Sequence, residues 1–184
     1  IIGIVLLLFV IVIMSFVGKY NKIVSKEEVV KEKWSQVENV YQRRADLIDN
    51  LVNTVKGYAD FERGTLTEVI EARSKATSIE IKGENLNEDN LRKFQEAQGN
   101  LSNALSRLMV VVERYPELKA GQNFLELQSQ LEGTENRIAV ERMRFNEATR
   151  DYNTYIRRFP QNIIAGLFGF EKKPYFETEK ENYK

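Results

Sequence analysis

The sequence contains no histidine and no cysteine, and these two absences exclude several classes of enzyme. Without histidine, the chain lacks the commonest general base and the commonest transition-metal ligand. Without cysteine, it can form no disulfide, no thiolate nucleophile and no cysteine-ligated zinc site. Carboxylate- or lysine-based chemistry would remain, but a di-metal carboxylate bundle requires Glu-x-x-His pairs, which are absent. We therefore expect no enzyme, no cofactor and no metal site.

Neither sign of charge is in excess, because the chain has 27 basic and 27 acidic residues. A nucleic-acid partner is not expected, since binding to phosphates requires a basic surplus. Proline is also scarce, and the three prolines are Pro116, Pro160 and Pro174. Nothing therefore forces a helix to end before Tyr115.

Charge is missing entirely from residues 1–18, IIGIVLLLFVIVIMSFVG. As a helix this segment spans about 27 Å, enough to cross the hydrocarbon core of a bilayer. A cleaved signal peptide and a buried core helix are the alternatives, but SFVGKYNK is a weak cleavage site and core helices rarely lack polar residues for so long. We expect residues 1–18 to be a transmembrane anchor in a bilayer. The chain begins without methionine, so some N-terminal residues are expected to be missing, and the lysines after the anchor favour an inside C-terminus on charge alone.

Apolar residues after the anchor recur at helical spacing. Ser25 and Glu28 could form a capping box that starts a new helix, or the anchor could continue without a break. We expect one helix to about Ser78, bent near Gly57 and Gly64, and about 80 Å long. Its predicted buried stripe is Val30, Trp34, Val37, Tyr41, Arg44, Ile48, Leu51, Val55 and Tyr58.

Two further long helices and a short one are predicted beyond a polar turn at residues 81–89. The first buries Leu91, Phe94, Leu101, Leu105, Leu108 and Val112, and the second has a heptad row of Phe124, Leu131, Ile138, Phe145, Tyr152 and Phe159. Pro160 ends this helix, and PQNIIAGLFGF adds a short one. The expected fold class is all-α, an N-terminal transmembrane helix followed by an antiparallel bundle of three long helices plus a short C-terminal helix. The expected boundaries are 1–18 for the anchor, 19–170 for the bundle and 171–184 for a loose, charged tail.

Acidic residues are concentrated in TVKGYADFERGTLTEVIEARSKA, residues 54–76, but they mostly fall off the apolar face of the predicted helix. We interpret them as a solvated face rather than a catalytic cluster. Arg44 and Glu141 lie within the apolar seams, and a lone buried charge is costly. Our hypothesis is that Arg44 pairs with Glu141 or with nearby Glu135 and sets the register of the helices. Asn50, Asn53, Asn146 and Asn153 could supply polar pairing or simply be exposed.

The C-terminal segment carries more apolar residues than a frayed tail. Two interpretations are open: these residues fold back as a cap on the bundle, or they contact a neighbouring subunit or the membrane. They are Ile163, Ile164, Leu167, Phe168, Phe170, Tyr175 and Phe176.

Long stretches of the chain resemble the LemA family. They include DLIDNLV after Arg43 and Arg44, the YPELKAGQNF turn, and EGTENRI followed by FNEATRDYNTYIRRFP. The resemblance implies a bacterial single-pass protein of the inner (plasma) membrane, with an extracytoplasmic (periplasmic) helical bundle. It implies no biochemical activity. The chain departs from the family pattern at Asp49, where proline is common, and at Phe61, where histidine is frequent.

We expect a scaffold that acts by homo-oligomeric assembly, because anchoring copies in one bilayer raises their effective concentration. The alternative is an adaptor that presents the bundle to a membrane protein, such as a protease or a signalling protein.

Overall fold

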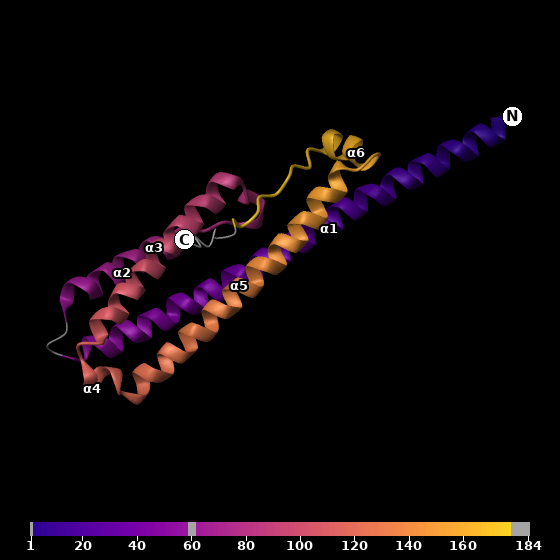
Figure 1. The fold of residues 1–184 in the computed structure, drawn as a ribbon. Coiled ribbons are helices and arrows are strands. Elements are labelled where there is room, and N and C mark those ends of the chain that lie inside the picture. Colours follow the sequence, from indigo (N-terminus) through magenta and orange to yellow (C-terminus); the bar gives the residue numbers. More distant parts are fainter. Residues whose placement is uncertain (1, 59–61, 178–184) are drawn as a thin grey trace, which may run out of the picture.

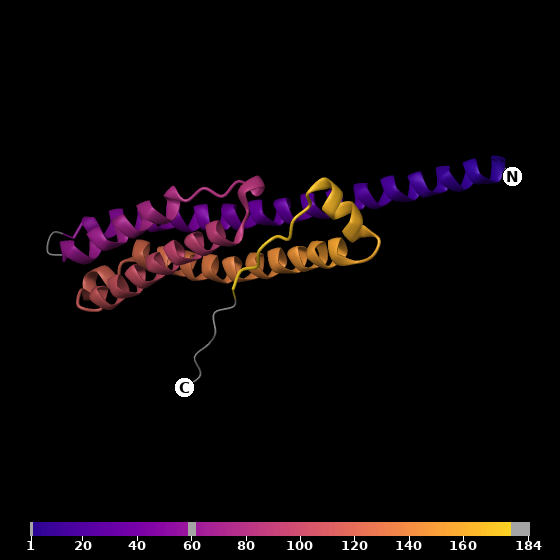
Figure 2. The ribbon, with the colours of Figure 1, turned by 90° about the horizontal axis from the view of Figure 1, so that it is seen from above.

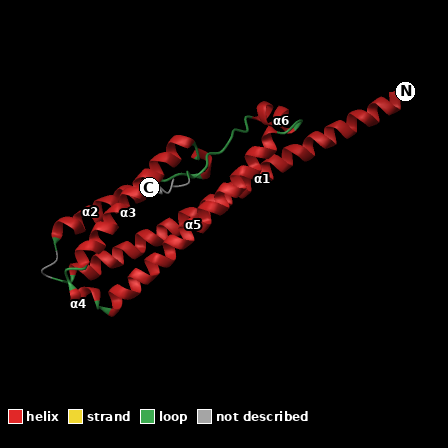
Figure 3. Ribbon diagram, in the orientation of Figure 1, coloured by secondary structure: helices red, strands yellow, loops and turns green. Residues whose placement is uncertain are grey.

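The computed structural model describes residues 2–58 and 62–177, in which every regular element is helical (Figure 3). The all-α prediction is confirmed, with a long apolar N-terminal helix and bundle-like packing. The elements in chain order are α1 (Ile2–Lys56), α2 (Arg63–Ser78), the 3-10 turn η1 (Gly83–Asn85), α3 (Glu88–Val112), α4 (Pro116–Lys119), α5 (Gln122–Arg157) and α6 (Gln161–Phe168).

Helix α1 joins the apolar N-terminal segment to the bundle without a break. It has 55 residues and is about 80 Å long at a rise of about 1.5 Å per residue. Ser25 therefore does not start a new helix, and the uninterrupted alternative is correct. Figure 1 shows the N-terminal part of α1 extending alone beyond all other elements. This part is apolar enough to cross a membrane and is not buried in the protein.

The prediction of one helix to Ser78 was wrong, because the chain reverses after Lys56. Helix α2 runs back along the bundle and packs mainly against α3 (Figures 1 and 2). On a straight helix, Leu66 and Val69 would lie on the same face as Ile48 and Leu51, which precede them by 18 residues, so their spacing fits either a continuous helix or a reversal. In the structure, the reversal buries both Leu66 and Val69 in the core cluster shared with α3. The bundle thus has four helices, α1, α2, α3 and α5, in place of the expected three, and α1 and α5 form its longest pairing.

Local sequence features explain where α3 begins and where α5 and α6 end. Asn87 caps α3, where its side-chain oxygen accepts a hydrogen bond from the Asn90 N–H at 2.9 Å. Helix α5 ends at Arg157, shortly before Pro160. Phe159, predicted to continue the heptad row, is consequently 80% exposed. Gly169 ends α6 with φ of 73°, a left-handed conformation that favours glycine.

The core consists of two apolar clusters with a polar layer between them. The stripe residues of α1 from Val30 to Val55 are buried as predicted, whereas Tyr58 is exposed. One cluster begins at Leu47 on α1 and ends at Leu131 on α5. The other cluster includes Tyr41 on α1 and Ile138 on α5, and it extends towards the anchor. The buried polar side chains at the boundary are Arg44, Gln98 and Thr134.

Candidate interaction surfaces

Acidic side chains do not converge into a group of possible metal ligands in the part of the chain that the structure describes. No group of three or more possible ligands occurs within residues 2–58 and 62–177. The acids around α2 instead pair with arginines of neighbouring helices. Glu68 and Glu62 lie 2.9 Å from Arg107 and Arg114, respectively. These exposed pairs link α2 and the residue preceding it to α3 and its C-terminal end, which agrees with a solvated face.

Arg44 connects three helices at the polar layer. Its side chain, on α1, is buried, and its Nε lies 2.9 Å from Glu135 Oε1 on α5. Because this N–H has no hydrogen-bond partner among the described residues, the contact is an ion pair rather than an aligned hydrogen bond. One guanidinium Nη2 group donates to Ser102 Oγ on α3 at 2.6 Å. Ser102 was not singled out from the sequence, because a serine on a helix has no pattern that predicts such a role.

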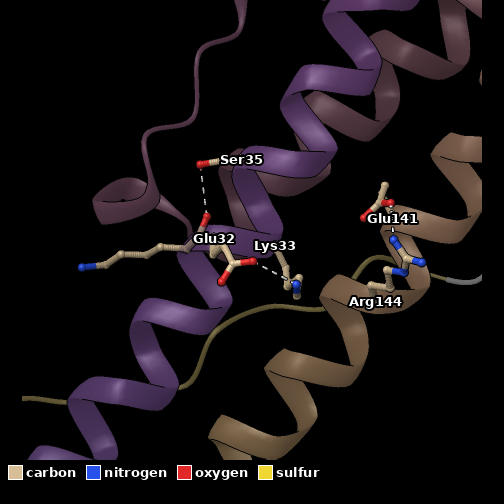
Figure 4. A network of polar contacts seen from close by, with 6 residues as sticks. Glu32, Lys33, Ser35, Glu141 and Arg144 are labelled. Atoms are coloured by element: carbon tan, nitrogen blue, oxygen red, sulfur yellow. Dashed lines mark hydrogen bonds and ion pairs between the residues drawn. The ribbon is translucent and has the colours of Figure 1, made fainter.

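Glu141, the other candidate partner of Arg44, lies elsewhere. Its Oε1 is 2.7 Å from Nη1 of Arg144, three residues further along α5. Figure 4 shows the two side chains turned towards each other on α5, separate from the Glu32–Lys33 pair of α1. Of the two glutamates considered, Glu135 is therefore the one that contacts Arg44.

A cleft of about 920 Å³ opens beside the polar layer. Its charged lining contains equal numbers of basic and acidic side chains, so it has no excess of one sign that would select an ion. These side chains are Arg44, Arg92, Arg142, Glu96, Glu135 and Glu177.

Residues 169–177, which we call the C-terminal strap, are held in an extended path along α5. The side-chain amide of Asn153 donates to the Lys173 carbonyl at 2.8 Å, and its oxygen accepts from the Lys173 N–H at 2.9 Å. Asn146 forms the same pair of bonds with Phe176, at 3.0 and 2.8 Å. The two asparagines thus serve the polar pairing that the sequence left open, whereas the side chains of Asn50 and Asn53 are exposed.

Phe176 anchors the strap in an aromatic cluster. Its ring stacks on Trp34 at 5.9 Å and meets Phe145 edge-on at 5.4 Å. The Arg142 guanidinium lies 4.9 Å from the centre of the same ring. Trp34 also donates from Nε1 to the Ile81 carbonyl at 2.6 Å. The expectation of a loose tail was therefore wrong for residues 171–177, because Phe176 is buried.

The C-terminal apolar residues divide into two groups. Ile164 and Phe176 are buried, and Phe170 packs partly against the same cluster. These residues cap the bundle. The other members of the set are exposed, namely Ile163, Leu167, Phe168 and Tyr175.

Helix α6 packs against the apolar, N-terminal part of α1. Phe168 lies 4.8 Å from Tyr20 and 6.2 Å from Phe16, measured between ring centres. A largely apolar cleft of about 320 Å³ lies between the two helices. It is lined from α1 by Ile11, Val12, Ser15, Phe16 and Lys19, and from the other side by Pro160, Ile163 and Ile164.

Glu38 is a partly buried carboxyl group on α1. Partial burial raises the pKa of its carboxyl group above the ordinary value of 4.5. Hydrogen bonding with Trp34 opposes this rise in pKa, and the nearby Glu80 carboxylate adds to it.

With this geometry established, comparison with known proteins identifies the family. The LemA family pattern matches residues 33–184. The chain belongs to the LemA family. It is 28% identical to Magnetosome protein MamQ 2 of Paramagnetospirillum magneticum, over 91% of this chain and 68% of the relative. Magnetosome protein MamQ of Magnetospirillum gryphiswaldense is 29% identical over the same shares. Protein LemA of Metamycoplasma hominis is 23% identical over 82% of this chain and 65% of the relative.

The two departures from the expected LemA pattern have different outcomes. Asp49 forms an ion pair with Arg73 of α2, so an acidic residue at this position links α1 to α2. A proline there would interrupt the hydrogen-bonding pattern of α1. Phe61 lies outside the described residues.

Proposed function

We propose that this LemA-family protein is a membrane-anchored scaffold of the bacterial cell envelope, which acts by homo-oligomeric assembly through its helical bundle. The observation that carries the proposal is the unbroken α1 helix, whose exposed apolar segment continues directly into the bundle core. Copies inserted in one bilayer would hold their bundles at the same height and at high effective concentration, so modest lateral contacts would suffice. The soluble bundle is proposed to be periplasmic, with the anchor in the inner membrane.

Two observations favour assembly over catalysis. The described residues contain no metal-binding cluster, and the cleft of about 920 Å³ beside the polar layer has a balanced charge.

Crosslinking in native membranes tests the scaffold. An amine-reactive crosslinker should produce a ladder of multiples of the 21.4 kDa chain. A variant in which residues 1–18 are replaced by an unrelated transmembrane helix should give the same ladder, because assembly is assigned to the bundle. A monomer band alone, under conditions that crosslink a known oligomer in the same membranes, would contradict the proposal.

The adaptor alternative, in which the bundle is presented to a membrane protease or signalling protein, predicts a different composition of the complex. Mild detergent extraction should then recover a second protein in fixed stoichiometry. Recovery of this chain alone as an oligomer would favour the scaffold.

Topology can be read from single-cysteine variants, since the chain has no native cysteine. Ser106→Cys places one thiol on an exposed position of α3. A membrane-impermeant maleimide should label it once the outer membrane is permeabilised. Labelling only after the inner membrane is disrupted would place the bundle inside the cell.

A further inference from the structure

The exposed side of α6 and the residues leading into it form an uncovered apolar surface, which we call the α6 surface. Phe159 is 80% exposed, Leu167 is 69% exposed, and Ile163 and Phe168 are each more than half exposed. No charged residue occurs between Arg158 and Glu171. Four large apolar side chains close together on one short stretch differ from the single exposed apolar residues that are normal on soluble proteins.

The place of the α6 surface along α1 indicates what covers it. Residues from Ile11 to Lys19 of α1 line the cleft that α6 residues close from the other side. All but Lys19 belong to the uncharged segment that is long enough to span a bilayer. If that segment crosses the membrane, α6 cannot lie above the membrane surface, because it lies beside the last turns of the span.

The side chains around the α6 surface fit a bilayer interface. Arg157 and Arg158 are exposed immediately before it, and exposed Glu171 and Lys172 follow it. Tyr20 and Phe168 are in ring contact at the level where charge first appears on α1. Aromatic rings and basic side chains at the edge of an apolar band are typical of the lipid headgroup region.

We propose that α6 is a second membrane element, in which the α6 surface is embedded among the lipid acyl chains next to α1 and the flanking basic residues contact the headgroups. The occupant of the surface is therefore lipid, and not a second copy of the chain. This inference depends on bilayer insertion of α1 but not on self-assembly of the bundle.

A second point of attachment would restrict the bundle in a way that one helix cannot. A single transmembrane helix leaves the soluble part free to rotate about the helix and to tilt. Because α6 is connected through Gly169 to the strap, and the strap is bonded to α5, embedding α6 would fix which face of the bundle points towards the membrane. Lateral contacts between copies would then always involve the same faces.

Lipid quenching of single fluorescent probes tests the embedding. Leu167→Cys and Val110→Cys are matched positions, since the native side chains are apolar and 69% and 70% exposed, but Val110 lies on α3 in the part of the bundle far from the anchor. Met14→Cys reports the span itself. Each full-length variant carries the same bimane probe and is reconstituted in phosphatidylcholine–phosphatidylglycerol vesicles with or without lipid bearing a nitroxide at acyl carbon 5.

The probe at Leu167 should be quenched by the nitroxide lipid at least threefold more than the probe at Val110, and it should be protected from aqueous iodide. Equal quenching at Leu167 and Val110 would overturn the inference. Protection from iodide without lipid quenching would also overturn it and would assign the surface to a second copy. Strong quenching at Met14 in either case would show that the anchor itself is inserted, so failure of the inference is distinguishable from failure of anchoring.

A second probe position tests whether the result depends on one particular substitution. Ile163→Cys, also on the α6 surface, should give the same pattern as Leu167→Cys. Because both native side chains are exposed, their replacement leaves the core intact, which thermal unfolding of each variant checks. Agreement between the two probes supports embedding, and an unquenched probe at Ile163 beside a quenched one at Leu167 would contradict it.

Discussion

The carboxamide of Asn153 is bonded to both backbone groups of Lys173, as a neighbouring β-strand would be. Asn146 repeats this arrangement seven residues earlier on α5, with Phe176 three residues later on the strap. Seven residues of helix rise about 10.5 Å, and three residues of extended chain cover about 10 Å. The two spacings match, so one face of a helix can hold an extended, antiparallel segment by its backbone.

Removal of either asparagine should loosen the strap. Asn153→Ala leaves the Lys173 N–H and carbonyl without these partners, at a cost of about 1–3 kcal/mol in strap attachment. Amide hydrogen exchange at Lys173 should become faster, while exchange in the middle of α3 should be unchanged. Asn50→Ala, at an exposed asparagine of α1, is the control and should change neither. Unaltered exchange at Lys173 in Asn153→Ala would show that the bonds do not hold the strap.

The packing of Phe176, which holds the strap in the aromatic cluster, can be followed through the fluorescence of the single tryptophan. Phe176→Ala removes the ring that stacks on Trp34 at 5.9 Å. Truncation of a buried phenylalanine costs about 3–5 kcal/mol, and local detachment of the strap limits the effect on the whole bundle. The fluorescence of Trp34 should shift to longer wavelength. Tyr175→Ala, at the exposed neighbouring position, should leave the spectrum unchanged, and a shift as large as that of Phe176→Ala would argue against a specific anchor.

The ion pair between Arg44 and Glu135 should contribute more to the free energy of unfolding than an exposed ion pair between helices. Glu135→Gln leaves the buried guanidinium of Arg44 without its counter-charge, and we expect a loss of about 1–3 kcal/mol in the free energy of unfolding. Glu68→Gln removes the exposed partner of Arg107 and should cost less than about 1 kcal/mol. Urea unfolding of the detergent-solubilised protein measures both values. Equal losses would indicate that Arg44 is solvated well enough not to need Glu135.

The same layer allows a test of register. In the double variant Arg44→Met with Glu135→Leu, apolar side chains replace both charges, and stability should recover at least in part relative to Glu135→Gln. If the charges set the register, disulfide crosslinking between cysteines introduced across α1 and α5 should give more than one pairing in the double variant. If the double variant gives only the disulfide pairing seen in the parent chain, the register of α1 and α5 is set by the apolar seams and not by the charges.

The raised pKa of Glu38 makes stability depend on pH. A carboxyl group with a folded-state pKa above its ordinary value of 4.5 favours folding when protonated, so its contribution is lost as pH rises through the folded-state pKa. Glu38→Gln should therefore raise the melting temperature at pH 7, and the gain should shrink towards pH 4. Glu147→Gln, at an exposed position of α5, is the matched control. A lower melting temperature for Glu38→Gln at pH 7 would show that the charge is stabilised in the folded protein.

Sequence periodicity was sufficient for most of the helical core. The row from Phe124 to Tyr152 is buried as predicted, as is the stripe from Val30 to Val55. The heptad row failed at Phe159, because the helix ends two residues before it. The reversal between α1 and α2 was missed for a different reason. The apolar spacing beyond Gly57 is compatible with either a bend or a turn, and the choice depends on whether α3 offers a surface for Leu66 and Val69.

The candidate contacts were likewise predicted only in part from the sequence. A charge in an apolar seam indicated that Arg44 needs a partner, but spacing along α5 could not distinguish Glu135 from Glu141, and it gave no sign of Ser102. The fold-back of the C-terminal apolar residues was one of the two interpretations left open, but the extended path of the strap and its bonds to Asn146 and Asn153 were not predicted, since an extended segment without periodic hydrophobicity resembles a disordered tail.

What the sequence alone determined is the local part of the molecule: the uncharged span of residues 1–18, the helical faces and the positions where proline ends a helix, because each depends on neighbours within a few turns. Tertiary structure decided which faces meet, that α2 folds back, that Phe176 fills the aromatic cluster beside Trp34, and that α6 lies against the apolar N-terminal segment of α1. These features depend on the packing of side chains distant in sequence, and the spacing of residues along a single helix carries no information about the surface on the other side of the contact.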